Sequence, residues 1–136
     1  MVGIVIVAHF DLAKEMARAV ELIVGKQEMF THVEIFPNED MVAIKKKIMN
    51  AIKSVDGGDG VIILTDMFGG TPSNISLSFL EEGKVEVVTG VNLPMLIKLA
   101  TFRVDKPINE LARFITGYGQ KNIYLATDLL KGKGKE

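Results

Sequence analysis

Uninterrupted apolar runs alternate along the chain with segments in which apolar residues recur every three or four positions. Residues 3–8 (GIVIVA) and 61–64 (VIIL) contain no polar side chain, a pattern typical of strands buried on both faces of a sheet. Residues 85–89 predict a further strand, and the alternating residues 32–36 predict a more exposed one. Helical spacing predicts the intervening helices at 12–24, 38–52, 71–82, 92–102 and 107–118.

This alternation of strands and helices indicates the fold class. Successive βαβ units form a mostly parallel sheet, and right-handed crossovers place helices on both of its faces. We expect a doubly wound α/β fold with strand order 2-1-3-4 and a C-terminal edge strand at 123–126. One domain should span residues 1–130, followed by a disordered, lysine- and glycine-rich tail at 131–136.

Composition excludes several classes of protein. The 136 residues are 48% hydrophobic and 24% charged, enough to fill a core, which excludes a disordered or fibrous chain. The formal net charge is −1, so the electrostatic footprint of a nucleic-acid binder is absent. Without cysteine, disulfides, thiolate catalysis and cysteine-metal sites are excluded, and two histidines are too few for a histidine metal cage. We expect no metal and no cofactor.

The N-terminus and the longest apolar runs bear on the cellular location. The chain begins Met-Val-Gly, without the basic stretch of a signal peptide. No apolar run approaches the roughly 20 residues of a membrane span. These observations predict a soluble, cytoplasmic protein.

The candidate chemistry lies where two buried strands end. In an open α/β sheet, ligands bind beyond the carboxyl ends of the strands, at the point where the strand order reverses. The first run leads into His9 and the third leads into Asp66, so we expect these side chains to face one another. A carboxylate on one imidazole nitrogen fixes the tautomer and leaves the other nitrogen free as a nucleophile. Gly69 and Gly70 allow backbone N–H groups to approach an oxyanion, and Thr71 adds a hydroxyl at a helix start.

These residues also have simpler interpretations. Gly69 and Gly70 fit a plain turn, Asp66 fits a turn position, and Thr71 before a proline fits a helix N-cap. Their convergence at one predicted sheet edge favours a site for an anion or for phosphoryl transfer. His32 lies in the alternating strand without a partner motif and is interpreted as an exposed surface histidine. Phe68, in the predicted site loop, is expected to be exposed to a docking partner.

Other chemistries of a sheet edge do not fit the sequence. No G-x-G-x-x-G follows the first strand, and the chain has neither a P-loop nor the G-x-S-x-G turn of a hydrolase. A response-regulator receiver would carry an acidic pair at the end of the first strand, where His9 stands. These classes are therefore set aside.

Three motifs in order resemble one known family. They are residues 3–9 followed by Leu-Ala at 12–13, residues 65–74 (TDMFGGTPSN), and residues 90–95 (GVNLPM). Together they resemble the enzyme IIA domain of the mannose family, part of the bacterial phosphoenolpyruvate:sugar phosphotransferase system (PTS), over residues 2–126.

The resemblance implies a cytoplasmic, homodimeric phosphocarrier that performs a phosphotransferase reaction. His9 would accept a phosphoryl group from the phosphocarrier protein HPr and pass it to a IIB component, with Asp66 orienting the histidine. Thr71 stands where the family often has serine, and residues 90–94 would form another loop at the same rim. The C-terminal segment would pack on the partner subunit.

Two departures from the family pattern affect what the resemblance implies. Phe10 and Asp11 follow His9 where the family usually has small residues, which bears on access and partner choice, although Asp11 also fits the N-cap of the next helix. No IIB domain follows, so IIB and any permease are expected as separate chains, with this protein at most peripheral to the permease. Those components would set the sugar. A second function stays open, a regulatory module whose phosphorylation state controls partner binding without sugar transport.

Overall fold

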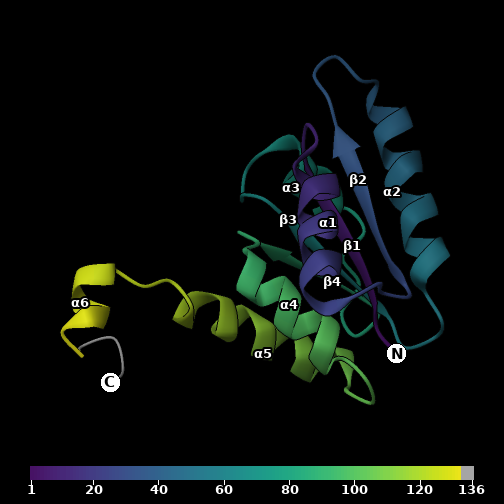
Figure 1. The fold of residues 1–136 in the computed structure, drawn as a ribbon. Coiled ribbons are helices and arrows are strands. Elements are labelled where there is room, and N and C mark those ends of the chain that lie inside the picture. The colour runs from purple at the N-terminus through teal and green to yellow at the C-terminus, as the bar shows by residue number, and fades with distance from the viewer. Residues whose placement is uncertain (133–136) are drawn as a thin grey trace.

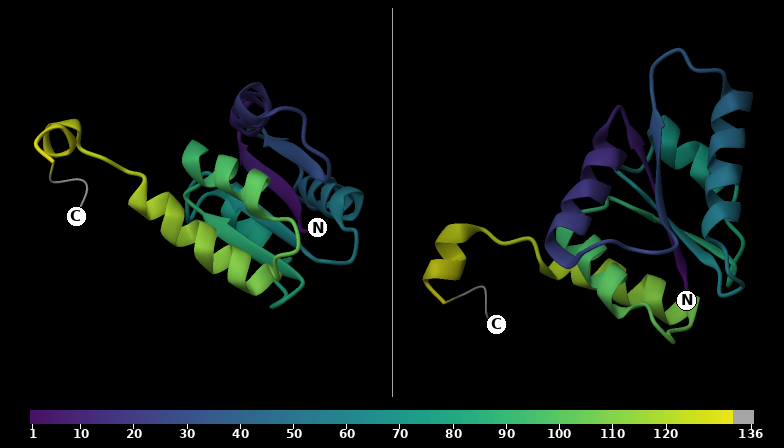
Figure 2. Two further views of the ribbon diagram at one scale, coloured as in Figure 1. Left: turned by 60° about the horizontal axis from the view of Figure 1, so that its bottom comes forward. Right: turned by 45° about the vertical axis from the view of Figure 1, so that its right-hand side comes forward.

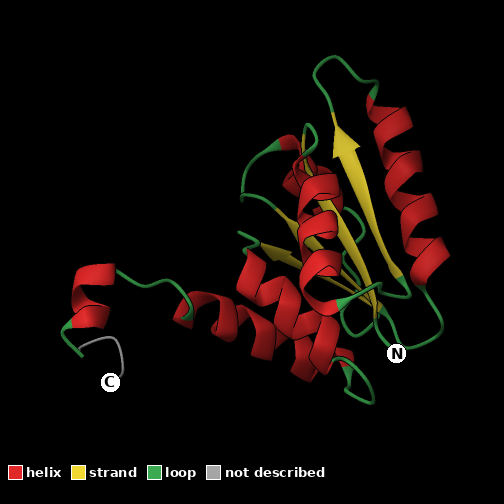
Figure 3. Ribbon diagram, in the orientation of Figure 1, coloured by secondary structure: helices red, strands yellow, loops and turns green. Residues whose placement is uncertain are grey.

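Four parallel strands form the sheet of the computed structural model, which describes residues 1–132 (Figures 1 and 3). They are β1 (Gly3–His9), β2 (Phe30–Ile35), β3 (Val61–Thr65) and β4 (Val85–Thr89). Their order is β2-β1-β3-β4, and all three pairings are parallel. The predicted doubly wound α/β fold and its 2-1-3-4 order are therefore confirmed.

Helices cover both faces of the sheet (Figure 2). One face carries α1 (Leu12–Val24), α4 (Leu93–Phe102) and α5 (Ile108–Lys121), and the other carries α2 (Met41–Val55) and α3 (Thr71–Leu77). Successive side chains of a strand point to opposite faces, so β1 supplies both cores. Ile4 and Ile6 pack with the first set of helices, whereas Val5 and Val7 pack with the second. His9 continues the alternation of Val5 and Val7 and therefore faces the side of α2 and α3.

The helix expected at 71–82 is shorter than predicted. It ends as α3 at Leu77, and the N–H of Ser78 bonds the carbonyl of Ile75 at 3.0 Å in a tightened last turn. The chain then turns, and Glu81 forms an isolated antiparallel bridge with Val85. The backbone of residues 78–84 thus leads into β4 instead of continuing the helix.

The predicted edge strand at 123–126 is wrong. Residues 123–125 are extended without strand pairing, and Ala126–Leu130 forms the short helix α6, which lies away from the sheet (Figures 1 and 2). A strand requires a neighbouring strand to pair with, and the sheet described within residues 1–132 ends at β4, whose strand neighbour is β3. Of the tail predicted to be disordered, residues 133–136 lie outside the described residues.

A buried arginine that the sequence did not predict fixes the opposite end of the sheet. Arg103 is 1% exposed and donates hydrogen bonds at 2.9 Å to the carbonyls of Val2 and Met29, and a further one to the carbonyl of Glu28. Burial lowers the pKa of its guanidinium below the ordinary value, against the opposing effect of the Glu28 charge. Arg103 thereby ties the end of α4 to the amino ends of β1 and β2.

None of the helices in residues 1–132 combines the length and apolar character that crossing a membrane requires.

Candidate active site

His9 and Asp66 meet at the carboxyl ends of adjacent strands, as predicted. His9 is the last residue of β1, and Asp66 directly follows β3. The Nδ1 atom of His9 lies 2.7 Å from Oδ2 of Asp66, and the backbone N–H of His9 donates to the same oxygen at 3.1 Å. The N–H of Met67 donates to Oδ1 at 3.0 Å. Both carboxylate oxygens are therefore held, and the imidazole is oriented by one of them.

The environment of Asp66 favours its ionised form. The side chain of Asp66 is 12% exposed and that of His9 is 41% exposed. Burial raises the pKa of Asp66, but hydrogen bonds from the backbone and ring of His9, together with attraction to the ring, outweigh it and hold the pKa below its ordinary value. An ionised Asp66 accepts a hydrogen bond from Nδ1–H, which leaves the lone pair of the neutral ring on Nε2.

Gly70 lies against the free edge of the imidazole. A Cβ atom at this position would stand 2.9 Å from Cε1 and 3.4 Å from Nε2 of His9, closer than packed atoms tolerate. Gly69 has a φ of +89°, a conformation that side chains rarely adopt. The two glycines therefore let the loop backbone approach Nε2, which is what an oxyanion site needs.

Thr71 shares a cleft with His9. The cleft has a volume of about 210 Å³ and lies between the loop after β2 and the start of α3. Gly70, rather than Thr71, holds the N-cap position of α3, and no side chain caps the helix. The interpretation of Thr71 as the N-cap is therefore wrong, and its hydroxyl is not occupied by capping. Thr71 and His9 therefore line the same cleft.

Comparison with known proteins assigns the family. Residues 3–116 match the EIIA-man family, described as "PTS system fructose IIA component". The chain belongs to this family. The resemblance that the three motifs predicted is thereby confirmed, and the family consists of phosphotransferase components of the sugar phosphotransferase system.

Individual relatives agree with this assignment. The fructose-specific EIIA component of Bacillus subtilis is 26% identical over 132 residues, covering 96% of this chain and 90% of that protein. The sorbose-specific EIIA component of Lacticaseibacillus casei is 33% identical over 109 residues, covering 79% and 78%. The mannose-specific EIIAB component of Escherichia coli is 29% identical over 124 residues, and there the match covers 90% of this chain but 38% of the relative.

Solved structures show the same fold. The mannose/sorbose-specific IIA subunit from Enterococcus faecalis superposes with a TM-score of 0.81 at 25% identity, covering 91% of this chain and 93% of that one. A PTS IIA protein associated with the fucose utilization operon of Streptococcus pneumoniae gives 0.80 at 27% identity, covering 94% and 95%.

The third motif contributes to the site through backbone rather than side chains. The N–H groups of Gly90 and Val91 both donate to the carbonyl of Thr65 at 2.9 Å, which fixes the end of β3 beside the carboxylate. Asn92 caps α4 by accepting from the N–H of Met95 at 3.0 Å and donates to the carbonyl of Gly119 at 3.0 Å. The motif therefore positions the rim without presenting a group to His9.

Phe10 and Phe36 are neighbours of His9 whose arrangement the sequence did not predict. Phe10 has a φ of +51°, a left-handed conformation that is a genuine outlier for a bulky residue and costs roughly 1–2 kcal/mol. Its N–H donates to the carbonyl of Ile35 at 2.8 Å. Its ring meets Phe36 edge-to-face, with centroids 5.9 Å apart. Phe36 directly follows β2. Because β2 was predicted to lie beside β1, the sequence could have indicated that Phe36 lies near His9 and Phe10.

The remaining candidates lie as follows. Phe68 is 72% exposed in the site loop, as predicted. Asp11 precedes α1 as expected, but its side chain makes no capping hydrogen bond. His32 is half-buried rather than exposed, and its Nδ1 lies 2.6 Å from Oε2 of Glu34, so the interpretation as an exposed surface histidine is wrong.

Proposed function

We propose that the chain is a cytoplasmic phosphocarrier of the sugar phosphotransferase system, which accepts a phosphoryl group from HPr on Nε2 of His9 and passes it to a IIB component. The observation that carries the proposal is the 2.7 Å contact between Nδ1 of His9 and Oδ2 of Asp66. It leaves Nε2 as the free nitrogen in a cleft that also holds Thr71. Membership of the EIIA-man family supports the same reaction.

The transfer uses the ring as a nucleophile. The lone pair of Nε2 attacks the phosphorus of phosphorylated HPr, the new N–P bond forms, and the bond to HPr breaks. The positive charge that develops on the imidazole is stabilised by ionised Asp66. The backbone at Gly70 and the hydroxyl of Thr71 stabilise the phosphoryl oxygens. Transfer to IIB repeats these steps in reverse, with an acceptor on IIB as the nucleophile.

Exposed apolar side chains flank the cleft and suit a protein donor. Four of them are more than half exposed: Phe10 (58%), Met41 (54%), Met67 (55%) and Phe68 (72%). Clustered exposed apolar residues mark protein interaction sites. HPr and IIB would therefore dock in turn on the same rim, with no nucleic acid involved and contact with a permease limited to the periphery.

Reconstitution tests the proposal. The protein is incubated with radiolabelled phosphoenolpyruvate, enzyme I and HPr, with HPr omitted in a control. We expect HPr-dependent label that is lost in acid and stable in base, because protonation of a phosphoramidate makes the imidazole a good leaving group. Addition of a cognate IIB should remove the label. An acid-stable label would contradict a phosphohistidine, and label that no IIB accepts would favour the regulatory function instead.

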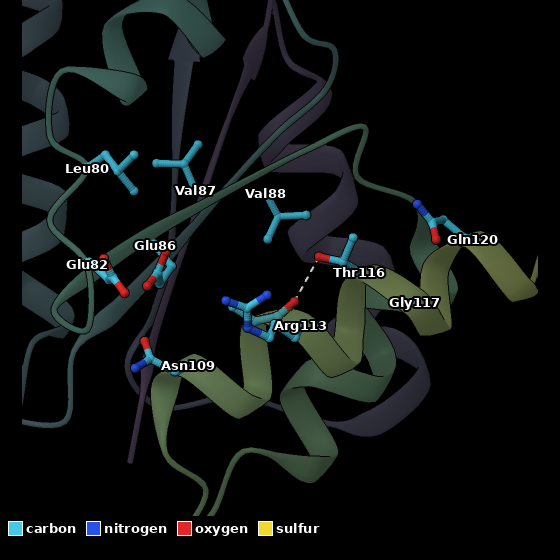
Figure 4. Close-up of a pocket in the computed structure, with 11 residues that line it drawn as sticks. Leu80, Glu82, Glu86, Val87, Val88, Asn109, Arg113, Thr116, Gly117 and Gln120 are labelled. Carbon is cyan, nitrogen blue, oxygen red and sulfur yellow. Dashed lines mark hydrogen bonds between the residues drawn. The ribbon is translucent and has the colours of Figure 1, made fainter.

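We further propose that the protein is a homodimer. A groove of about 890 Å³ runs along β4 and α5, and Figure 4 shows Val87 and Val88 on one side with Thr116 and Gly117 on the other. The side chains of residues 123–125 are apolar and exposed, and this segment extends away from the sheet. An unpaired strand edge is normally covered, and this segment of a second copy would cover the groove.

Light scattering tests the dimer. The protein should have twice the monomer mass at micromolar concentration, and the double variant Ile123→Asp/Leu125→Asp should be monomeric, because two charges would enter the groove. The control variant Leu22→Asp changes an exposed residue of α1, 86% exposed, and should stay dimeric. A wild-type monomer would remove the proposal.

A further inference from the structure

We propose that Phe10 and Phe36 form an aromatic wall, which keeps water away from phosphorylated His9 and so sets how long the phosphohistidine survives. Both residues line the cleft that holds His9 and Thr71. The inference rests on the proposed function, since it assumes that Nε2 of His9 carries the phosphoryl group.

The placement of Phe10 is not explained by core packing. Its side chain is 58% exposed, and neither core includes it. Its backbone nevertheless holds a left-handed φ of +51° directly after His9. Such conformations persist where the surroundings over-determine them, and they cluster at functional sites. Two contacts hold Phe10 in this conformation: the hydrogen bond from its N–H to the carbonyl of Ile35, and the edge-to-face contact of its ring with Phe36.

Phe36 is held in place by Glu39 and Lys47. Its N–H donates to Oε1 of Glu39 at 2.7 Å, and Nζ of Lys47 donates to Oε2 of Glu39 at 2.9 Å. The bond from Phe36 and the one from Lys47 hold the pKa of Glu39 below its ordinary value. The loop after β2 is thereby fixed to α2, and Phe36 offers Phe10 a stable surface.

The wall acts on the competing reaction of the phosphoprotein. In hydrolysis, the oxygen of water attacks phosphorus, the bond to Nε2 breaks, the water releases a proton, and inorganic phosphate leaves with the imidazole restored. This attack needs a water molecule in line with the N–P bond. Apolar ring edges offer water no hydrogen-bond partner, and exclusion of water from a site suppresses such side reactions. The wall therefore favours transfer to a partner over loss to solvent.

A small chemical donor tests the wall independently of HPr. Phosphoramidate phosphorylates imidazole directly, with ammonia as the leaving group. Wild type and the variants Phe10→Ala, Phe10→Leu and Phe36→Ala are labelled, freed of donor, and followed by the release of inorganic phosphate at pH 8. We expect the half-life of the label to fall by about threefold or more in Phe10→Ala and Phe36→Ala, and less in Phe10→Leu, which keeps an apolar side chain.

A second exposed aromatic pair provides the matched control. Phe114 stacks on Phe102 with centroids 5.1 Å apart on the outer surface of α4 and α5. Phe114→Ala should keep the wild-type half-life, and circular dichroism should show all variants folded, since both wall residues are exposed.

The outcomes separate the two proposals. An unchanged half-life in folded Phe10→Ala and Phe36→Ala would overturn the wall, even where HPr labels His9 normally. Label from phosphoramidate but none from phosphorylated HPr would overturn the proposed function, while the half-lives would still decide the wall. A half-life shortened equally in Phe114→Ala would also contradict the wall, because the effect would then not depend on proximity to His9.

Discussion

Two histidines of this chain make nearly the same contact in different places. Nδ1 of His9 lies 2.7 Å from a carboxylate oxygen of Asp66, and Nδ1 of His32 lies 2.6 Å from one of Glu34. Their side chains are 41% and 35% exposed. They lie on adjacent parallel strands, where His32 is opposite Ile6, three residues before the end of β1. The chemistry of the two pairs is therefore matched, and their positions differ.

Position decides which pair has a site around it. Glu34 comes from the same strand as His32, two residues on, whereas Asp66 lies 57 residues from His9, directly after a different strand. At the carboxyl edge, loops approach the ring, and Gly70 leaves space beside Nε2. In mid-strand the neighbouring backbone is already committed to the sheet ladder. A histidine–carboxylate pair is thus common chemistry, and a binding site arises where backbone is free to surround it.

The largest expected effect separates the two histidines directly. His9→Ala should abolish the HPr-dependent, acid-labile label, because His32, the second histidine of the chain, does not line the cleft. His32→Ala should be labelled at the wild-type rate. Labelling with radioactive phosphoenolpyruvate, enzyme I and HPr measures both. Undiminished label on folded His9→Ala would remove His9 as the phosphoryl acceptor.

The two carboxylates should differ next. Asp66→Asn keeps the size of the side chain but weakens the hydrogen bond that orients Nδ1. By analogy with carboxylates that orient metal-binding histidines, we expect the labelling rate to fall by about 10–100-fold. The label should still appear on His9, only more slowly. Glu34→Gln should leave the labelling rate unchanged. Initial rates of labelling decide this, and label on Asp66 itself, detected by its loss in alkali, would reverse the roles.

A smaller effect is expected from the glycine loop. Gly70→Ala introduces a Cβ that would stand 2.9 Å from Cε1 of His9, so the ring or the loop must shift. A displacement of this kind should reduce the labelling rate by about tenfold, since reactive groups tolerate little misplacement. The labelling rates of Gly70→Ala and wild type are compared at a temperature at which thermal unfolding shows both proteins to be folded. A wild-type rate would show that the backbone at position 70 does not define the site.

The smallest expected effect is on stability. The fold lowers the pKa of Asp66 below its ordinary value of 3.8, so the ionised carboxylate stabilises the folded state above that pH. This contribution disappears as pH falls through the lowered folded value. Asp66→Asn should therefore cost about 1 kcal/mol at pH 7 and less in acid. Urea unfolding at several pH values measures the difference in the free energy of unfolding between wild type and Asp66→Asn. A difference that grows as the pH falls would contradict this prediction.

The sequence predicted the elements that depend on neighbouring residues. Apolar runs and one alternating segment located the four strands, and the ends of two of them placed His9 and Asp66 at one edge. The place of Gly69 and Gly70 in a loop beside His9 and the exposure of Phe68 were also predicted from the chain. The helix expected at 71–82 was too long, because the bridge between Glu81 and Val85 depends on where β4 begins.

Contacts between distant segments were decided only by the tertiary structure. The wall formed by Phe10 and Phe36 requires β2 to lie beside β1, and Arg103 reaches carbonyls as far away as Val2. Residues 123–126 have the composition of a strand, yet within residues 1–132 no strand of the sheet pairs with them. Hydrophobic periodicity and turn residues determine local structure over a few positions, so they can be recognised in the sequence. Pairing, close approach and the surroundings of a side chain depend on which surfaces folding brings together.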